Sequence, residues 1–307
     1  MTRPVYRPKG VSMRISADML PSAPALCRFQ LQDADAHLGW WDGSTIFDLR
    51  DSRGAAATLA RLLEDGRPLA QAAAALTRSA PRRALEEIAL LPPIDTQEIW
   101  AAGVTYERSR QARMTESESA ADMYWNVYVA ARPELFYKGT ARLTAGPEQP
   151  IRVRADSRWS VPEPELALLV DPHMHIAGFT IGNDVSARDI EGENPLYLPQ
   201  AKVFAGACAL GPWIVPSESV AEPYALPITC SISRGGETVW QDATSTAQLH
   251  RRFDELLEYL YRAMTFPDGV FLLTGTCLVP PDTLSLQTGD VVKIGIGGLG
   301  ILRNVVG

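Results

Sequence analysis

The chain has 307 residues, of which 46% are hydrophobic and 21% are charged. This composition is typical of a globular protein, and the length favours a main domain with a smaller partner over a single compact core. The formal net charge is −7 and no dense run of Lys or Arg occurs, which argues against a nucleic-acid partner because such proteins usually carry a basic patch.

Cysteine spacing and the polar N-terminus argue against several other classes of protein. The cysteines form no Cys-x-x-Cys pair and no Cys/His cluster, so we expect buried free thiols in a reducing compartment rather than disulfides or zinc. No apolar run resembles a signal peptide or is long enough to span a bilayer. These features predict a cytoplasmic protein without a membrane partner. The four cysteines are Cys27, Cys208, Cys230 and Cys277.

Residues 1–93 predict a small α+β domain. Strand-like segments come first, and Asp42-Gly43 between two of them is a good hairpin signal. Ala- and Leu-rich segments with helical spacing follow, and Leu91-Pro92-Pro93 then interrupts the chain, so we place the domain boundary there. The expected strands are 29–31, 37–41 and 45–48, and the expected helices are 55–63, 69–76 and 82–90.

Residues 94–307 form short apolar segments separated by Gly and Pro turns. The pattern predicts a mainly β domain, within an α+β chain, rather than a series of βαβ units. Two helices are expected as well, at 107–131 and 245–264, and the second carries apolar residues along one face. The expected strands are 99–103, 135–138, 151–153, 166–170, 179–181, 213–215, 228–233, 291–296 and 299–305.

An acidic cluster is the most informative feature of this second region. Strand side chains alternate between faces, so Glu163 and Glu165 point the same way. If the chain returns through a turn centred near 173–175, Glu165 lies opposite Asp184, and three carboxylates converge at one end of a hairpin. The same register pairs apolar residues on the other face, Leu168 with Ile181 and Val170 with Phe179.

Carboxylates held together repel one another unless a cation lies between them, and a hard divalent ion with oxygen ligands suits that position. The cluster contains no His or Cys, which argues against zinc and favours Mg²⁺, with Mn²⁺ and Ca²⁺ as alternatives. A solvated acidic strand edge is the simpler explanation of Glu-x-Glu alone. The pairing with Asp184 and the cations Arg188 and Lys202 that follow favour the metal site.

The two cations each leave an alternative open. If the segment after Asp184 is helical, Arg188 lies one turn beyond it and could bind a ligand carboxylate, but an ion pair with Asp189 or Glu191 is equally compatible. Lys202 is isolated in an apolar segment, where desolvation favours the neutral amine that can act as a base. The Gly/Pro-bounded loop before it predicts a lid or a recognition element.

Taken in order, these residues resemble the fumarylacetoacetate hydrolase superfamily. The resemblance runs over residues 96–307, about two-thirds of the chain, and Glu-x-Glu followed by Asn-Asp-x-Ser-Ala-Arg-Asp is its most specific part. The matching segments are Ala102–Tyr106, Phe136–Lys138, Gly146-Pro147, Pro150-Ile151, Glu163–Glu165, Gly182–Asp189, Lys202, Leu210–Pro212, Thr274–Thr276, Leu286–Val292 and Gly298–Asn304.

The resemblance implies a C-terminal β-sandwich roll that holds Mg²⁺ or Mn²⁺, a homodimer, and a small 2-oxo acid or β-diketone as substrate. It implies Lys202 as the base or electrophilic partner. The implied metal ligands are Glu163, Glu165 and Asp184, and the implied substrate-binding residues are Arg188 and Thr276, to which we add Tyr106 and Glu191 from the matching or adjoining segments.

One departure from the family pattern bears on the reaction. Hydrolases of the family usually carry a His shortly after the Gly-x-x-Tyr segment, whereas this chain continues from Tyr106 with Glu-Arg-Ser-Arg-Gln. The next acidic residues that a short lid helix could supply are Glu116 and Glu118. The segment 189–202 is instead similar to the branch of the family that dehydrates 2-keto-3-deoxy-D-arabinonate. The resemblance therefore favours a dehydratase.

The expected chemistry begins with a metal that chelates the 1-carboxylate and 2-oxo group and stabilises an enolate. Lys202 or Glu116 would remove a C3 proton, and Glu193 or a water would assist loss of the C4 hydroxyl, giving 2-oxoglutarate semialdehyde. Two alternatives remain open: a C–C bond hydrolase or decarboxylase of acylpyruvate type, and a non-catalytic protein that a metal stabilises and that binds a ligand.

Overall fold

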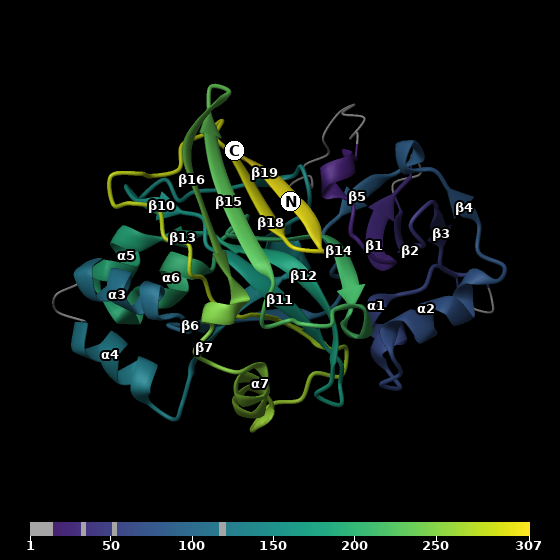
Figure 1. Ribbon diagram of the computed structural model, residues 1–307, viewed down its shortest axis with the longest axis horizontal. Coiled ribbons are helices and arrows are strands. Elements are labelled where there is room, and N and C mark those ends of the chain that lie inside the picture. Colours follow the sequence, from purple (N-terminus) through teal and green to yellow (C-terminus); the bar gives the residue numbers. More distant parts are fainter. Residues whose placement is uncertain (1–14, 32–34, 51–53, 117–120) are drawn as a thin grey trace, which may run out of the picture.

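The computed structural model describes residues 15–31, 35–50, 54–116 and 121–307, without the side chains of residues 112–116 and 121. Two β-sheets pack face to face, and helices surround their ends and edges (Figure 1). The α+β class, mainly β, and the β-sandwich are therefore confirmed. None of the helices in the described part of the chain has the length and apolarity that a bilayer crossing requires.

Twelve strands form the larger sheet. They are β1 (Ala25–Gln30), β2 (Ala36–Trp41), β3 (Ile46–Asp48), β4 (Arg82–Arg83), β5 (Ala89–Leu91), β6 (Glu98–Gly103), β7 (Glu134–Thr140), β8 (Thr144–Ala145), β11 (Pro164–Val170), β12 (Ile176–Asp184), β14 (Cys208–Pro216) and β17 (Val270–Leu273). Their order is β4-β3-β2-β1-β14-β12-β11-β17-β6-β7, with β5 beside β1 and β8 beside β14. Strands β11 and β14 are buried along their whole length, so both faces of the sheet contact a core.

The smaller sheet has five strands, β9 (Pro150–Ile151), β15 (Pro227–Arg234), β16 (Glu237–Ser245), β18 (Val291–Ile296) and β19 (Gly300–Val306). Alternate side chains of β15 and β18 are buried against the larger sheet, as the two-residue period of a strand requires. A separate ladder of β10 (Ser160–Val161) and β13 (Ser186–Ala187) flanks the acidic segment.

Seven α-helices lie around the sheets within the described residues. They are α1 (Leu59–Leu63), α2 (Leu69–Thr77), α3 (Glu107–Glu116), α4 (Ala121–Val129), α5 (Arg188–Glu193), α6 (Leu198–Lys202) and α7 (Phe253–Tyr261). Leucines of α1, α2 and α7 are buried in the cores, which explains their helical spacing in the sequence. In contrast, α3, α4, α5 and α6 gather at one end of the molecule (Figure 1), and residues of α3, α5 and α6 line a pocket there.

The structure corrects several expected elements. The segment 82–90 contains β4, a short 3₁₀ turn and most of β5 instead of a helix, because the chain pairs there with β3 and β1. The helix expected at 107–131 is divided into α3 and α4. The helix expected at 245–264 begins only at Phe253, because Ser245 ends β16 and a 3₁₀ turn, Thr246–Gln248, follows. Strands β16 and β17 had no counterpart in the prediction. The cysteines are free and buried, as expected.

The larger sheet continues across the boundary predicted at Pro93. Leu26 of β1 pairs with Ile214 of β14, and Trp213 donates from Nε1 to Met19 O at 2.7 Å. Trp213 also packs against Trp41, with ring centroids 6.1 Å apart. The division into 1–93 and 94–307 stays a prediction, and these contacts give the N-terminal segment a packing role against the strands that carry the site.

Candidate active site

The carboxylate hairpin forms, but in a register two residues from the expected one. Glu165 pairs with Gly182, and Asp184 lies opposite Glu163, whose main-chain oxygen accepts a bond from Asp184 N at 3.0 Å. The predicted pairs of apolar residues shift accordingly, to Leu166 with Ile181 and Leu168 with Phe179. A shift of two residues leaves each side chain on its face of the strand, so the three carboxylates still converge.

The turn accounts for the difference in register. Asp171 N donates to His175 O at 2.9 Å, which closes the turn about one residue earlier than expected. The side chain of Asp171 fixes this turn, because its Oδ1 accepts from His173 N at 2.8 Å and from His175 N at 2.9 Å. Such local bonds to an aspartate are typical of tight turns and are hard to place to the residue from a sequence.

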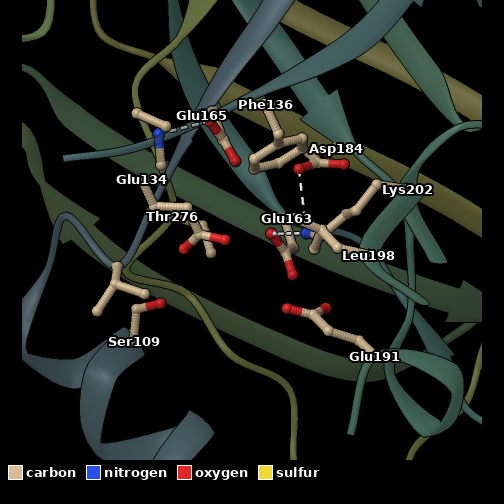
Figure 2. A pocket seen from close by; sticks show the side chains of 14 residues that line it. Ser109, Glu134, Phe136, Glu163, Glu165, Asp184, Glu191, Leu198, Lys202 and Thr276 are labelled. Atoms are coloured by element: carbon tan, nitrogen blue, oxygen red, sulfur yellow. Dashed lines mark hydrogen bonds and ion pairs between the residues drawn. The ribbon is translucent and has the colours of Figure 1, made fainter. Parts of the chain in front are cut away.

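Glu163, Glu165 and Asp184, hereafter the triad, offer three carboxylate oxygens that lie within 4.8 Å of one another. All three side chains are buried (Figure 2). Burial raises the pKa of Glu165 well above its usual value, and the negative charges of Asp184 and Glu163 raise it further. A buried set of three oxygen donors fits a hard divalent cation, which removes the repulsion that keeps this pKa high.

Gly275 supports the third carboxylate of the triad. Its N–H donates to Glu165 Oε2 at 2.5 Å. Its φ of +91° belongs to the left-handed region, and a Cβ at this position would lie 1.9 Å from Thr105 Oγ1. Only glycine therefore allows this backbone N–H to approach the carboxylate without displacing Thr105.

Lys202 is buried in polar rather than apolar surroundings, which corrects the expectation from its flanking residues. Its Nζ donates to Glu163 Oε2 at 2.9 Å, to Asp184 Oδ2 at 3.1 Å and to Ser186 Oγ at 2.6 Å. The Phe136 ring lies 5.7 Å away, at cation–π distance. Since an ammonium has three donors, this geometry describes a charged lysine that bridges two triad carboxylates.

Arg188 is the first residue of α5, so it does not lie one helical turn beyond Asp184. It is buried, and its Nε donates to Glu163 Oε1 at 3.1 Å. The neighbouring Asp189 accepts instead from Ser157 Oγ at 2.6 Å and from the main chain of Arg158 at 2.7 Å. Arg188 therefore contacts the triad and is not among the residues that line the pocket.

Lys138 is a site residue to which the sequence assigned no role. It is buried, its Nζ forms an ion pair with Asp184 Oδ1 and a hydrogen bond with the main-chain oxygen of Lys202, and it lies 3.3 Å from Val185 O. One side chain thus joins a triad carboxylate to the segment that carries Lys202. Glu134, Phe136 and Lys138 alternate along β7, so a period-two search of this strand would have indicated a shared face.

A pocket of about 330 Å³ opens beside the triad. Glu134 and Glu191 line it together with the triad, as do Ser109 of α3 and Leu198 of α6 (Figure 2). Gly103 leaves space for Glu134, whose Oε2 would lie 2.1 Å from a Cβ at that position. The predicted residues that line the pocket are the triad, Lys202, Glu191 and Thr276, and the unpredicted ones include Ser109, Glu134, Phe136 and Leu198.

Four other predicted residues lie away from the pocket wall or cannot be placed. Tyr106 is fully buried, and its hydroxyl has no hydrogen-bond partner within the described part of the protein. Burial, followed by the nearby Cys277 and Glu165, raises the pKa of Tyr106, so its hydroxyl stays neutral. Glu193 is exposed on α5. Glu116 ends α3 with its side chain outside the described residues, and Glu118 is not described.

Known proteins share both the sequence and the fold. A model of the fumarylacetoacetate (FAA) hydrolase C-terminal domain matches residues 98–307. A probable 2-keto-3-deoxyxylonate dehydratase of Haloferax volcanii is 51% identical over 214 residues, which are 70% of this chain and 73% of that protein. A 2-dehydro-3-deoxy-D-arabinonate dehydratase of Saccharolobus solfataricus is 42% identical over 221 residues, which are 71% of this chain and 74% of that protein.

A solved structure extends the similarity over nearly the whole chain. It is a 2-keto-3-deoxy-D-arabinonate dehydratase complexed with magnesium and 2,5-dioxopentanoate, with a TM-score of 0.77 and 34% identity, and the match covers 92% of this chain and 98% of that one. The sequence motifs, the sandwich and the buried triad agree with these similarities. The chain belongs to the fumarylacetoacetate hydrolase family.

Proposed function

We propose that the protein is a Mg²⁺-dependent dehydratase that converts a 2-keto-3-deoxy sugar acid, 2-keto-3-deoxy-D-arabinonate in the first instance, to 2,5-dioxopentanoate (2-oxoglutarate semialdehyde). The observation that carries the proposal is a single pocket in which a buried carboxylate triad and Lys202 meet two further carboxylates, Glu134 and Glu191. The names of the two relatives at 51% and 42% identity support the same reaction.

The charges of the site suit a divalent cation and an anionic substrate. Two of the triad carboxylates, Glu163 and Asp184, contact three cationic side chains, Lys138, Lys202 and Arg188, so the formal charges of the triad and these cations sum to zero. A bound Mg²⁺ held by the triad would supply a Lewis acid that polarises the 2-oxo group and favours ionisation at C3. The ion would raise the formal charge of a pocket that also holds Glu134 and Glu191 by two, which favours binding of the substrate carboxylate.

The reaction requires several proton transfers around the carbon chain. A proton leaves C3 and the protonated hydroxyl leaves C4 as water, which gives a C3–C4 double bond. A proton then leaves C5 and one is added at C3, which gives an enol at C4 and C5. The enol loses its O–H proton and gains a proton at C4, so that C5 becomes the aldehyde. The balance is the loss of one water. Because C4 and C5 lie beyond the 2-oxo group, proton transfer there needs an acid and a base other than the metal ligands.

Glu191 and Glu134 line the pocket beside the triad, and we assign them the base and acid roles. Lys202 donates three hydrogen bonds in this structure, so it is suited to stabilising negative charge near the 2-oxo oxygen and to returning a proton. The hydroxyls of Thr276 and Ser109 can bind the substrate's oxygens from the pocket wall. Roles for Arg188 and Tyr106 in binding substrate, and for Glu116 and Glu193 in catalysis, stay predictions.

The hydrolase alternative would be favoured by a histidine in the pocket that activates water. No histidine is among the described residues that line the pocket, so no such side chain is placed there to activate a water. A non-catalytic protein would have no use for two further carboxylates facing the same pocket as the triad. A homodimer, a cytoplasmic location and the use of Mn²⁺ or Ca²⁺ also stay predictions.

A product assay tests the proposal. Protein stripped of metal with a chelator and reloaded with Mg²⁺ is given 2-keto-3-deoxy-D-arabinonate or, separately, an acylpyruvate. We expect 2,5-dioxopentanoate from the sugar acid, and a loss of turnover of about 10²-fold or more in both Glu191→Gln and Glu134→Gln, as for removal of an acid–base group. Pyruvate from the acylpyruvate, without semialdehyde from the sugar acid, would replace the dehydratase with the hydrolase.

A further inference from the structure

The segment 249–251 contacts both ends of the helical pair α3 and α4, which brings Ser109 to the pocket. At the start of α3, His250 N donates to Thr105 O at 2.9 Å, and Leu249 forms an antiparallel bridge with Tyr106. These contacts fix the point at which the chain leaves β6 and enters α3. The same segment therefore sets the position of the first turn of α3, in which Ser109 lies.

Arg251 fixes the other end of the pair. The last carbonyl groups of a helix lack hydrogen-bond donors within the helix. Here the Arg251 guanidinium supplies those donors. Its Nη2 donates to Val127 O at 2.8 Å and to Ala130 O at 2.5 Å, and lies 3.4 Å from Tyr128 O. A cation at this end also complements the helix dipole. Arg251 is only 5% exposed, and its Nη1 forms an ion pair with Glu255 of α7.

Aromatic contacts strengthen the same attachment. The His250 ring stacks on Tyr128, with centroids 4.2 Å apart and an interplanar angle of 20°. Tyr128 and Val127 pack against a small apolar cluster of Tyr124 and Val104. Val104 lines the pocket, so the inner face of α4 rests on the pocket wall.

A cation–π cluster connects α4 to Ser109. The guanidinium of Arg110 in α3 lies 4.6 Å from the Trp125 ring centroid and 5.2 Å from that of Tyr128. Arg110 directly follows Ser109, which is 5% exposed and lines the pocket. The contacts therefore run without interruption from Arg251 through α4 to a hydroxyl at the pocket.

We propose that Arg251 is a positioning residue for the substrate. It does not line the pocket, but it caps α4 and thereby holds Ser109 of α3 against the substrate. The triad stands on β11 and β12, which Arg251 does not contact within the described hydrogen bonds and ion pairs, so metal binding is independent of it. The part of the test that measures turnover rests on the dehydratase proposed above.

The neighbouring Arg252 provides a matched control. It carries the same charge one residue later and its side chain is 67% exposed. Its contacts, Asp254 at 3.4 Å and the Tyr224 ring at 4.7 Å, involve neither α3 nor α4. We expect Arg251→Ala to speed amide hydrogen exchange in 121–129 at least tenfold and to leave the Kd for Mg²⁺ within twofold. KM for the sugar acid should rise about tenfold with little change in kcat, since a ground-state contact is lost. Arg252→Ala should change none of these quantities.

A double-mutant cycle tests whether Arg251 acts through Ser109. If it does, Ser109→Ala and Arg251→Ala raise KM similarly and the double variant raises it no further, because each removes the same contact. Arg251→Lys, which keeps the charge but not the fork of donors, should fall between wild type and Arg251→Ala. It also serves as the folded variant if Arg251→Ala is unstable.

The outcomes separate this proposal from the proposed function. Additive effects of Ser109→Ala and Arg251→Ala on KM, or unchanged exchange in α4, would overturn the positioning role. Weakened Mg²⁺ binding in Arg251→Lys would show a general structural defect and overturn it as well. If the wild-type protein does not dehydrate the sugar acid, the proposed function fails. Faster amide hydrogen exchange of α4 in Arg251→Ala, with unchanged Mg²⁺ affinity, would still support Arg251 as the cap of α4.

Discussion

Glu165 differs from the other two triad carboxylates in its partners. In the described contacts Glu163 and Asp184 each bind cationic side chains, whereas Glu165 accepts only the N–H of Gly275. The raised pKa of Glu165 means that the charged carboxylate is disfavoured in the metal-free protein, first by burial and then by its neighbours. The metal-free protein should therefore lose stability as the pH rises from the unfolded-state pKa of about 4.3 toward the raised value.

Glu165→Gln separates stability from metal binding. The neutral amide avoids both the desolvation and the repulsion, so we expect the metal-free variant to have a Tm at neutral pH equal to or above that of the wild type. Mg²⁺ at 100 times Kd stabilises the wild type by about 2.7 kcal/mol, roughly 5 °C, and this increment should vanish in the variant. Calorimetry with and without Mg²⁺ measures both. A variant that keeps the full Mg²⁺ increment would remove Glu165 from the ligands.

Lys138 binds two groups that lie far from it in the sequence, the Asp184 carboxylate and the main-chain oxygen of Lys202. Lys138→Met leaves Asp184 with one cation fewer and deprives a main-chain oxygen of its donor, so we expect a loss of about 3 kcal/mol of stability without metal. Saturating Mg²⁺ should reduce this loss, because the ion supplies positive charge beside the same carboxylate. Lys293→Met, on the exposed side of β18, is the control and should change the Tm by less than about 1 °C. An equal loss with and without Mg²⁺ would assign Lys138 a purely structural role.

The sequence identified the triad but not its neighbours. Glu163, Glu165 and Asp184 could be grouped because strand alternation survives a register error of two residues, as the observed pairing of Glu165 with Gly182 shows. Lys138 could not be grouped with Asp184 by any local rule, since β7 lies at the far edge of the sheet and reaches the triad only through tertiary packing. The burial of Lys202 in a polar cluster was hidden for the same reason.

At the scale of elements, an arginine clamp fastens β15 to the loop before β18. Arg234 at the end of β15 donates from Nε and Nη2 to the two oxygens of Asp290, both at 2.8 Å, and Gln287 N donates to the same carboxylate. Burial alone would raise the pKa of Asp290, but the bonds from Arg234 and Gln287 outweigh it and the pKa is lowered.

The lowered pKa fixes the pH range over which this clamp stabilises the fold. Its contribution is complete above the unfolded-state pKa of about 3.9 and is lost as the pH falls through the lower folded value. Since the Arg234 side chain is 37% exposed, solvent screens the pair, and we expect Asp290→Asn to cost about 1–2 kcal/mol at pH 7. Denaturant unfolding should show this difference shrinking as the pH falls from the unfolded-state pKa through the lowered folded-state pKa. A difference that persists in acid would attribute the cost to packing, and Asp254→Asn, an exposed carboxylate, is the control.

Elements that depend on local pattern were predicted better than those that depend on pairing. Helix α2 and the strands β6, β11 and β18 carry a clear period and were found within a few residues. The segment 82–90 has helical spacing, yet it pairs with β3 and β1, because long-range hydrogen bonds outweigh the small differences in propensity. The edge strand β16 is largely exposed, so it lacks the apolar alternation that would have revealed it.

At the scale of the whole molecule, the predicted boundary at Pro93 implies that the N-terminal region folds by itself. The continuous sheet implies instead that this region folds together with the rest of the chain. The break at Leu91-Pro92-Pro93, and the change there from helical spacing to short apolar segments, are visible in the sequence. The pairing of Leu26 with Ile214, and the packing of Trp213 against Trp41, are visible only in the fold. Because β14 carries Trp213 and also pairs with β12, which holds Asp184, the N-terminal strands support the site indirectly.

Separating the chain at Pro93 tests this dependence. The fragment 94–307 would expose the edge of β14 and the apolar side chains that β1 covers, including Ile214 and Trp213. Exposing a few such side chains costs about 1.5–3 kcal/mol each, which is comparable in sum with the whole stability of a domain. We therefore expect the fragment to aggregate, or to bind Mg²⁺ weakly and unfold without cooperativity, and fragment 1–93 added in trans to restore a cooperative transition. If 94–307 alone folds cooperatively and binds Mg²⁺ as the full chain does, the predicted boundary is a true domain boundary, and the shared sheet is an interface between two independent units.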